Sequence, residues 1–125
     1  MSEKPKYHFV RANEGDIKDF DWGQLAWKAS AGLGNSDALT FGVVTIRKGC
    51  HNPPHIHPNC SEILCLLRGE LDHVVGDETV RMGHGDTIII PAGIPHHANS
   101  VGDQDAVMIT AFSSAHREII HLEDQ

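Results

Sequence analysis

Two histidines separated by one residue, with a carboxylate close behind, form the part of this sequence best suited to chemistry. His55 and His57 stand two positions apart, and Glu62 follows five residues after the second histidine. Because a β-strand turns alternate side chains to one face, an extended segment would point both imidazoles the same way. Imidazole nitrogens and a carboxylate oxygen together bind divalent first-row transition metals. The stretch Gly49 to Gly69 therefore predicts a metal-binding loop, with a histidine-containing surface loop as the alternative.

A second histidine motif follows an apolar segment further along the chain. Residues 85–96 read GDTIIIPAGIPH, so two prolines and a glycine fix the direction of the backbone before His96. A rigid approach suits a metal ligand, because coordination geometry tolerates little positional error. The adjacent His97 should point away from His96 in an extended backbone. His96 therefore joins the first three residues as a candidate ligand.

The segments around these motifs have the length and composition of short β-strands. Apolar and β-branched runs predict strands at 39–46, 79–82, 87–90 and 106–114, two more within 62–76 that are separated at Gly69, and an edge strand at 7–10. Residues 91–100 predict a loop, and residues 117–122 fit either a final strand or a short helix. Gly- and Pro-punctuated strands at this spacing are typical of a small all-β sandwich or barrel.

Composition indicates one domain and limits the classes of partner. A chain of 125 residues supports a single core, with residues 1–20 as an N-terminal arm or edge strand and residues 39–115 as the barrel. The net charge is −7 and no basic run occurs, so we expect no nucleic-acid partner. No stretch approaches the roughly 20 apolar residues of a membrane span, and the N-terminus lacks the apolar region of a secretion signal. We therefore expect a soluble, cytoplasmic protein without a membrane partner.

The three cysteines do not predict a disulfide framework. Their number is odd and their spacing does not repeat, which favours reduced thiols. Cys65 lies in an apolar run and is interpreted as a small core residue. Cys50 and Cys60 flank the histidine pair, where a thiolate ligand is the less favoured interpretation.

The two histidine motifs resemble those of the cupin superfamily. The first motif agrees with the family at every signature position, Gly49-x5-His55-x-His57-x4-Glu62-x6-Gly69, and the second agrees at most of them, Gly85-x5-Pro91-x-Gly93-x2-His96. The family pattern ends on Asn four residues after the second motif's histidine, where this chain has Ser100 and places Asn99 one residue early. The chain thus resembles a small single-domain cupin, with its motifs at residues 49–69 and 85–100.

This resemblance implies a double-stranded β-helix, the jelly-roll barrel, with a metal centre inside it. The implied ligands are His55, His57, Glu62 and His96, and the implied cofactor is one divalent transition metal, Fe, Mn, Ni or Zn. Small cupins of this kind are commonly dimers, which implies a homodimer. The apolar residues Phe9, Trp22 and Trp27 are available for its interface, and for the two tryptophans core or subunit-interface packing is favoured over stacking on a ligand.

The ligand set favours catalysis on a small molecule. Three neutral imidazoles and one carboxylate leave a six-coordinate divalent ion with positive charge and two open positions for water, O2 or a bidentate substrate. We therefore predict a metal-dependent oxidoreductase, dioxygenase- or decarboxylase-like, that acts on a small oxygenated acid or carbonyl compound. Two alternatives remain open: a non-redox metalloenzyme, such as a sugar isomerase or a uronate-processing enzyme, and a small-molecule-binding module with a structural metal.

Other residues near the motifs receive lesser roles. Strand alternation from Glu62 turns Leu64 and Leu66 inward, which predicts an apolar pocket wall. His51 and His97 are candidates for acid–base groups or for hydrogen bonds to the metal ligands. His73 and His84 are interpreted as surface or strand residues without a catalytic role. Arg117 is expected in a surface salt bridge rather than on a substrate carboxylate.

Overall fold

The computed structural model describes residues 6–122, and within that range it is built from β-strands alone. The described chain therefore has no helix of the length and apolarity that crossing a membrane requires. The strands are β1 (Asp16–Phe20), β2 (Gly23–Ala29), β3 (Thr40–Ile46), β4 (His55–Ile56), β5 (Glu62–Arg68), β6 (Leu71–Val75), β7 (Glu78–Met82), β8 (Thr87–Ile90), β9 (His96–Ser100), β10 (Ala106–Phe112) and β11 (Ile120–His121).

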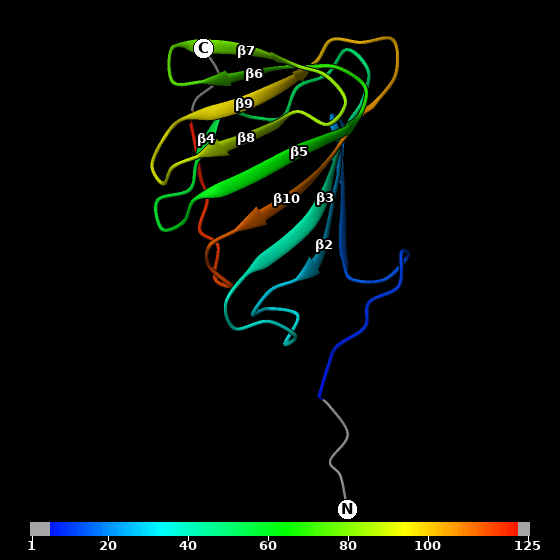
Figure 1. The fold of residues 1–125 in the computed structure, drawn as a ribbon, viewed down its shortest axis with the longest axis vertical. Helices are drawn as coiled ribbons and strands as arrows, with labels where there is room; N and C mark the ends of the chain where they lie inside the picture. Colours follow the sequence, from blue (N-terminus) through cyan, green and yellow to red (C-terminus); the bar gives the residue numbers. More distant parts are fainter. Residues whose placement is uncertain (1–5, 123–125) are drawn as a thin grey trace, which may run out of the picture.

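Two antiparallel sheets face one another, as Figure 1 shows. The larger sheet has the order β1-β2-β3-β10-β5-β8, and the smaller has the order β11-β4-β9-β6-β7. Strand β10 lies between β3 and β5, so the last long strand joins two strands that come much earlier in the chain. The predicted all-β jelly-roll fold is confirmed.

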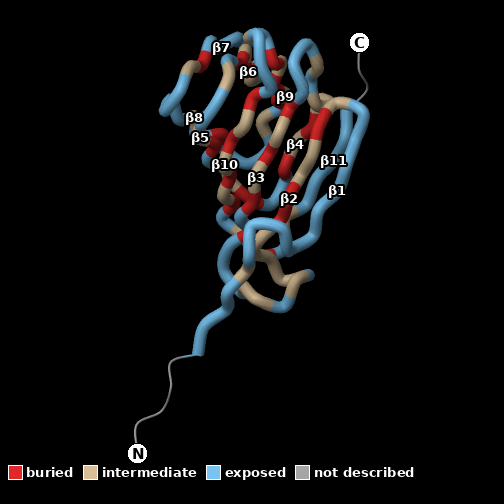
Figure 2. The backbone as a smooth tube through the Cα atoms, turned by 90° about the vertical axis from the view of Figure 1, so that its right-hand side faces the viewer, coloured by how far each residue is buried: buried red, intermediate tan, exposed pale blue. Residues whose placement is uncertain are grey.

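Alternating side chains build the core between the sheets. Strand β10 reads AVMITAF and alternates buried with half-buried positions along its whole length. Figure 2 shows the buried residues along the middle strands and the exposed ones at the loops and sheet edges. Leu64 and Leu66 of β5 are both buried, as their predicted inward orientation requires. This pattern follows from the two-residue period of a strand packed on one face.

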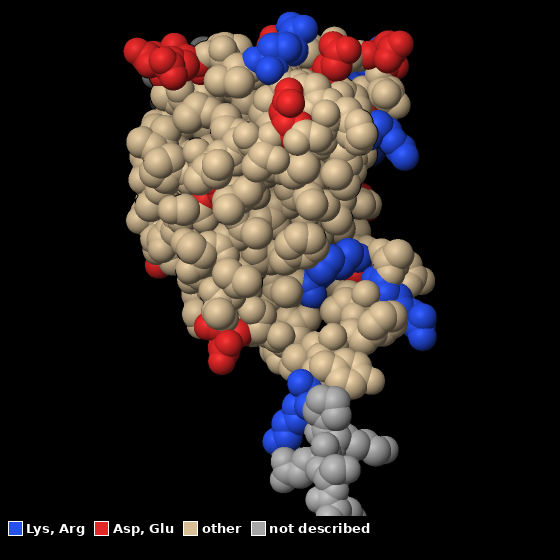
Figure 3. Space-filling view, in the orientation of Figure 1, with Lys and Arg blue, Asp and Glu red and all other residues tan. Residues whose placement is uncertain are grey.

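The outer face of the larger sheet is poor in charge. In Figure 3 most acidic and basic side chains lie at the top, along the right-hand side and at the lower edge, and the face over β5 and β10 is largely uncharged. Half-buried and exposed apolar side chains of these strands, such as Ile63, Leu67 and Ile109, lie on that side.

Two local predictions were wrong, and one strand was not predicted. Residues 7–10 form no strand; one edge of the larger sheet is β1, which lies further along the predicted arm or edge strand of residues 1–20. The segment around Trp27 is strand β2, where the sequence analysis predicted no strand. Residues 96–100 belong to strand β9 rather than to a loop, because pairing with β6 overrides the low β-propensity of this polar segment. The ambiguous C-terminal segment contains the short strand β11 and no helix.

Candidate metal centre

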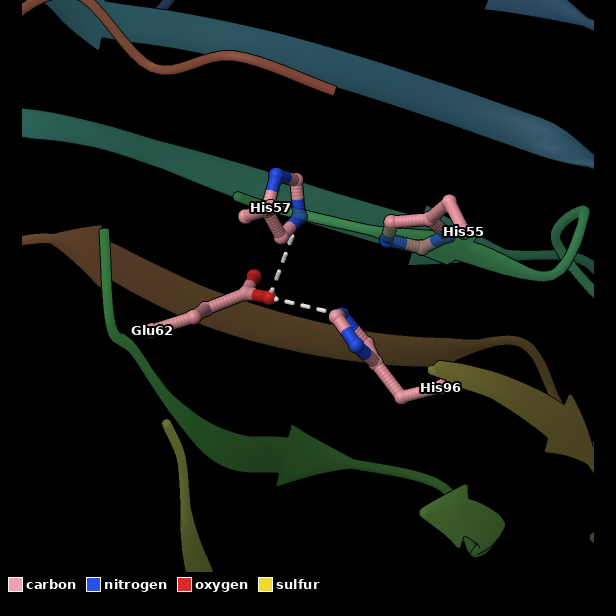
Figure 4. A group of neighbouring side chains, drawn as sticks. All are labelled: His55, His57, Glu62 and His96. Carbon is pink, nitrogen blue, oxygen red and sulfur yellow. Dashed lines mark hydrogen bonds and ion pairs between the residues drawn. The ribbon is translucent and has the colours of Figure 1, made fainter. Parts of the chain in front are cut away.

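The starts of three strands bring the four predicted ligands together. His55 opens β4 and pairs with His96 at the start of β9, which places both on the smaller sheet. His57 comes directly after β4, and Glu62 opens β5 in the opposite sheet. All four are buried, and their ligand atoms lie within 4.8 Å of one another. Figure 4 shows their side chains converging from the two sheets.

Backbone carbonyl groups fix the tautomer of all three imidazoles. Each Nδ1 lies at hydrogen-bond distance from a carbonyl oxygen: His55 from Pro53 at 2.7 Å, His57 from Glu118 at 2.8 Å, and His96 from Ile94 at 2.9 Å. A carbonyl oxygen only accepts hydrogen bonds, so each Nδ1 must carry the hydrogen and donate it. The Nε2 atoms of the neutral rings are then left with lone pairs that point into the cluster. A metal-binding histidine needs this arrangement.

The carboxylate of Glu62 is oriented in the same way. Its Oε2 accepts a hydrogen bond of 2.6 Å from the hydroxyl of Thr110, while Oε1 lies 3.0 Å from Nε2 of His96 and 3.5 Å from Nε2 of His57. Between neutral imidazoles in the fixed tautomer and a carboxylate, every facing atom is an acceptor. Such a cluster is favourable only when a cation, either a proton or a metal ion, lies among these atoms.

The pKa values limit how far protons can fill that role. Burial, with a smaller contribution from His96, lowers the pKa of His55 to about 3, and burial also lowers the pKa of His57. Burial acts to raise the pKa of Glu62, but the contact with His96, which becomes a hydrogen bond when a proton occupies Nε2, and the hydrogen bond from Thr110 outweigh it and hold that pKa below its usual range. At neutral pH the cluster therefore contains a carboxylate and at least two uncharged imidazoles. This donor set fits a divalent transition metal.

The cluster opens onto a largely apolar cavity of about 270 Å³ between the sheets. Aromatic and aliphatic side chains form most of its wall, among them Phe20, Trp22, Leu25, Trp27, Met108 and Phe112. Leu64 also lines it, as predicted, whereas Leu66 lies deeper in the core. The prediction of core packing for Trp27 holds, since the residue is 7% exposed, but both tryptophans also face the cavity.

His73 lies in a different place from the one its sequence context suggested. It is a strand residue of β6, as expected, but it is 2% exposed and lines the cavity. Its ring centroid is 6.1 Å from that of His96, and its Nδ1 has no hydrogen-bond partner within residues 6–122. Burial and the neighbouring His96 lower the pKa of His73 to about 4. The period-two alternation from Leu71 could have identified its inward orientation.

Arg117 also departs from the prediction. Its guanidinium carbon lies 4.4 Å from the ring centroid of Trp27 and 5.4 Å from that of Phe112, at the edge of the cavity. No carboxylate oxygen of residues 6–122 lies within ion-pair distance of it, so the expected surface salt bridge is wrong for the described chain. Stacking of a guanidinium on aromatic rings is a favourable cation–π contact.

The remaining candidates lie outside the cavity wall. The rings of His51 and His97 are 5.8 Å apart, and neither residue is among those that line the cavity. His97 is half-buried beside the buried His96, in line with their opposite orientations on β9. His84 is exposed in a turn. The three cysteines are free thiols, and none belongs to the ligand group.

Comparisons with known proteins agree with this geometry. The family model of the cupin domain matches residues 42–112, which include both histidine motifs. The chain belongs to the cupin family. The putative germin-like protein 3-4 of Oryza sativa subsp. japonica is 33% identical over 96 residues, and oxalate oxidase 1 of Hordeum vulgare is 33% identical over 98 residues. Each alignment covers 69% of this chain.

Solved structures share the fold of this cupin. A variant of Bacillus subtilis oxalate decarboxylase superposes with a TM-score of 0.84 over 98% of the chain at 23% identity. The formate complex of Lactobacillus farciminis oxalate decarboxylase gives a TM-score of 0.81 over 88% of the chain at 21% identity. This cupin chain spans 41% and 47% of the two plant relatives and about a third of the two decarboxylase chains, 35% and 34%.

Proposed function

We propose that this cupin is a metal-dependent oxidoreductase, dioxygenase- or decarboxylase-like, that acts on a small oxygenated acid or carbonyl compound. A divalent transition metal held by His55, His57, Glu62 and His96 would be its cofactor. The names of the similar proteins, which include oxalate oxidases and oxalate decarboxylases, support this class of reaction.

One observation carries the proposal: all three buried imidazoles are held as the same tautomer by backbone carbonyl groups. A histidine with only a structural role in a core would satisfy both ring nitrogens with hydrogen bonds. Three that each direct Nε2 toward one carboxylate instead provide a preformed ligand set. The bound metal would supply a Lewis acid and, when redox-active, a site for one-electron or O2 chemistry.

The side chains around the ligands orient Glu62 and His57 and surround the space in which a substrate would bind. Thr110 donates to Oε2 of Glu62 and thereby leaves Oε1 to face the imidazoles. The ring of Phe112 packs edge-on against His57, with 4.8 Å between centroids, and restricts its rotation. A substrate bound against the aromatic wall of the cavity would displace water, which would strengthen its electrostatic interactions with the site.

The apolar cavity wall also bears on the alternative functions. A sugar or a uronate presents hydroxyl groups on every side, and each buried hydroxyl needs a hydrogen-bond partner. Most of the wall is apolar, with Trp22, Leu25 and Met108 among its residues, and outside the ligand cluster its polar members are Lys18, Asn52, His73, Arg117 and His121. A compact acid or carbonyl compound therefore fits better than a sugar.

The homodimer and the cytoplasmic location stay predictions from the sequence.

Metal analysis and oxygen uptake test the proposal. Untagged protein should bind one equivalent of a divalent transition metal, and His96→Ala should lose most of it. His84→Ala, which changes an exposed histidine outside the cluster, should retain it. Fe-, Mn- and Ni-loaded protein should then be assayed for O2 consumption and for CO2 release over a panel of small oxo and hydroxy acids.

Two results would contradict the proposal. Full metal occupancy in His96→Ala would show that the ligand set is misassigned. Metal-loaded protein that neither consumes O2 nor releases CO2 with any acid of the panel would favour the non-redox or binding alternative.

A further inference from the structure

Arg117 is a cation that forms no ion pair with a carboxylate of residues 6–122. Its guanidinium stacks on Trp27 at 4.4 Å and lies 5.4 Å from the Phe112 centroid. Within residues 6–122 it donates no side-chain hydrogen bond and forms no ion pair, and the residue is half-buried rather than free in solvent. The carboxylate of Glu62 attracts Arg117 without forming an ion pair and is itself engaged by Thr110 and His96. A ligand that brings its own carboxylate would therefore be stabilised beside this partly desolvated guanidinium.

The charge of the cavity wall differs from that of the whole protein. The chain carries a net charge of −7, yet among the described residues that line the cavity the one acidic side chain is Glu62, which is engaged in the ligand cluster. Lys18 and Arg117 both line the cavity, and Lys18 is mostly exposed and 3.7 Å from Asp16. Arg117 is therefore the cation best placed to attract an anion into the cavity.

The position of Arg117 relative to the cluster suits a ligand that spans both. Phe112 touches both groups, since its ring centroid is 5.4 Å from the Arg117 guanidinium carbon and 4.8 Å from the His57 centroid. Arg117 is thus no farther from the His57 ring than the sum of these two distances. A molecule of aromatic-acid size can therefore place its carboxylate on Arg117 and another polar group at the ligand cluster.

The size and the wall of the cavity indicate which chemical group of the ligand lies between Arg117 and the metal-ligand cluster. A volume of about 270 Å³ is nearly twice the roughly 150 Å³ of an apolar cavity that binds benzene. Trp27 and Phe112 lie beside Arg117, and the cavity wall also includes Phe20, Trp22 and Leu25. Oxalate has no apolar part to bury against such a wall. A carboxylate that carries an aromatic or branched aliphatic body gains from burying it.

We propose that Arg117 anchors the carboxylate of a substrate whose apolar body, at least the size of an aromatic ring, fills the cavity. This inference rests on the proposed function for the chemistry at the metal, but the binding preference itself needs no metal. Arg117 is a specificity-determining residue here, which selects monocarboxylates with an apolar body over oxalate and over uncharged analogues.

Ligand titration of metal-free protein tests the inference. The chain has two tryptophans and both line the cavity, so intrinsic fluorescence reports directly on its occupancy. Phenylacetate, its uncharged analogue phenylacetamide and oxalate should each be titrated in the presence of a chelator. We expect phenylacetate to bind at least about tenfold more tightly than phenylacetamide, the factor typical of a charge-assisted hydrogen bond. Oxalate should bind more weakly than phenylacetate.

Three variants separate the anchor from general effects. Arg117→Met keeps the length of the side chain but removes the charge, and it should bind phenylacetate and phenylacetamide equally. Arg117→Lys keeps the charge and should retain part of the preference, although a lysine lacks the planar guanidinium fork. Arg47→Met changes an exposed arginine outside the cavity wall and should match the parent protein.

Each result has a defined consequence. Equal affinity of the parent protein and of Arg117→Met for phenylacetate would refute the role of Arg117 in binding the carboxylate. A parent protein that does not bind phenylacetate would refute it too. If oxalate binds more tightly than phenylacetate, the inference that the ligand has an apolar body is wrong. Failure of the proposed function appears instead in the separate metal analysis, because a protein without metal still shows the Arg117-dependent preference if the inference holds.

Discussion

Replacing His73 by leucine should make the metal-free protein less sensitive to acid. His73 is 2% exposed, and its Nδ1 has no hydrogen-bond partner among the described residues. Leucine has a similar volume and no polar atom, so the change removes a buried polar group without opening a large cavity. At pH 7.5 we expect the free energy of unfolding to stay equal or to rise by on the order of 1 kcal/mol.

The pH dependence follows from the lowered pKa of His73. Burial, and then the neighbouring His96, lower this pKa from 6.5 to about 4 in the folded protein. Below pH 6.5 His73 binds a proton in the unfolded chain but not in the folded protein, so the free energy of unfolding falls as the pH falls toward 4. The loss is about 1.4 kcal/mol per pH unit, or about 2 kcal/mol between pH 7.5 and pH 5. The His73→Leu variant should be spared that loss.

Urea unfolding followed by tryptophan fluorescence measures the difference. The experiment needs a chelator, because a metal on the neighbouring imidazoles adds its own pH dependence. Parent and variant should both lose stability in acid, since burial also lowers the pKa of His55 to about 3, but the variant should lose about 2 kcal/mol less. His84→Leu, at an exposed position, controls for the general effect of removing a histidine. If the parent protein and His73→Leu lose the same free energy of unfolding between pH 7.5 and pH 5, the reasoning is refuted.

Three further predictions concern residues that support the site. Thr110→Val removes the 2.6 Å hydrogen bond to Glu62 and should weaken metal affinity by about tenfold or more in a chelator competition, and Thr110→Ser should restore it. Gly42→Ala places a methyl group 2.6 Å from the Trp27 ring, so thermal unfolding should report a loss of about 1–3 kcal/mol; an unchanged melting temperature would contradict this clash. Ser100→Ala removes a buried hydroxyl without a partner in the described chain and should leave stability equal or higher by on the order of 1 kcal/mol. A clear loss there would show that the hydroxyl is engaged.

Local sequence was sufficient for the fold class and for the four candidate ligands. Gly and Pro punctuation and period-two alternation are properties of neighbouring residues, and they predicted strands at β3, β5, β6, β7, β8 and β10. The spacing of His55, His57 and Glu62 carries the same kind of information, because strand geometry converts spacing into direction. Strand β9 escaped prediction, since its polar residues form a strand only through pairing with β6.

What surrounds the ligands was decided by contacts between distant parts of the chain. The carbonyl that fixes the tautomer of His57 belongs to Glu118, 61 residues away, and the ring beneath Arg117 belongs to Trp27 on the second strand. No local pattern encodes such a contact, because it depends on which strands pair and in which register. The sequence by itself determined the fold class and the candidate donor set. The tertiary structure alone decided the tautomers of the three histidine ligands, the inward position of His73 and the stacking of Arg117 on aromatic rings. These features depend on side chains and carbonyl groups that only folding brings together.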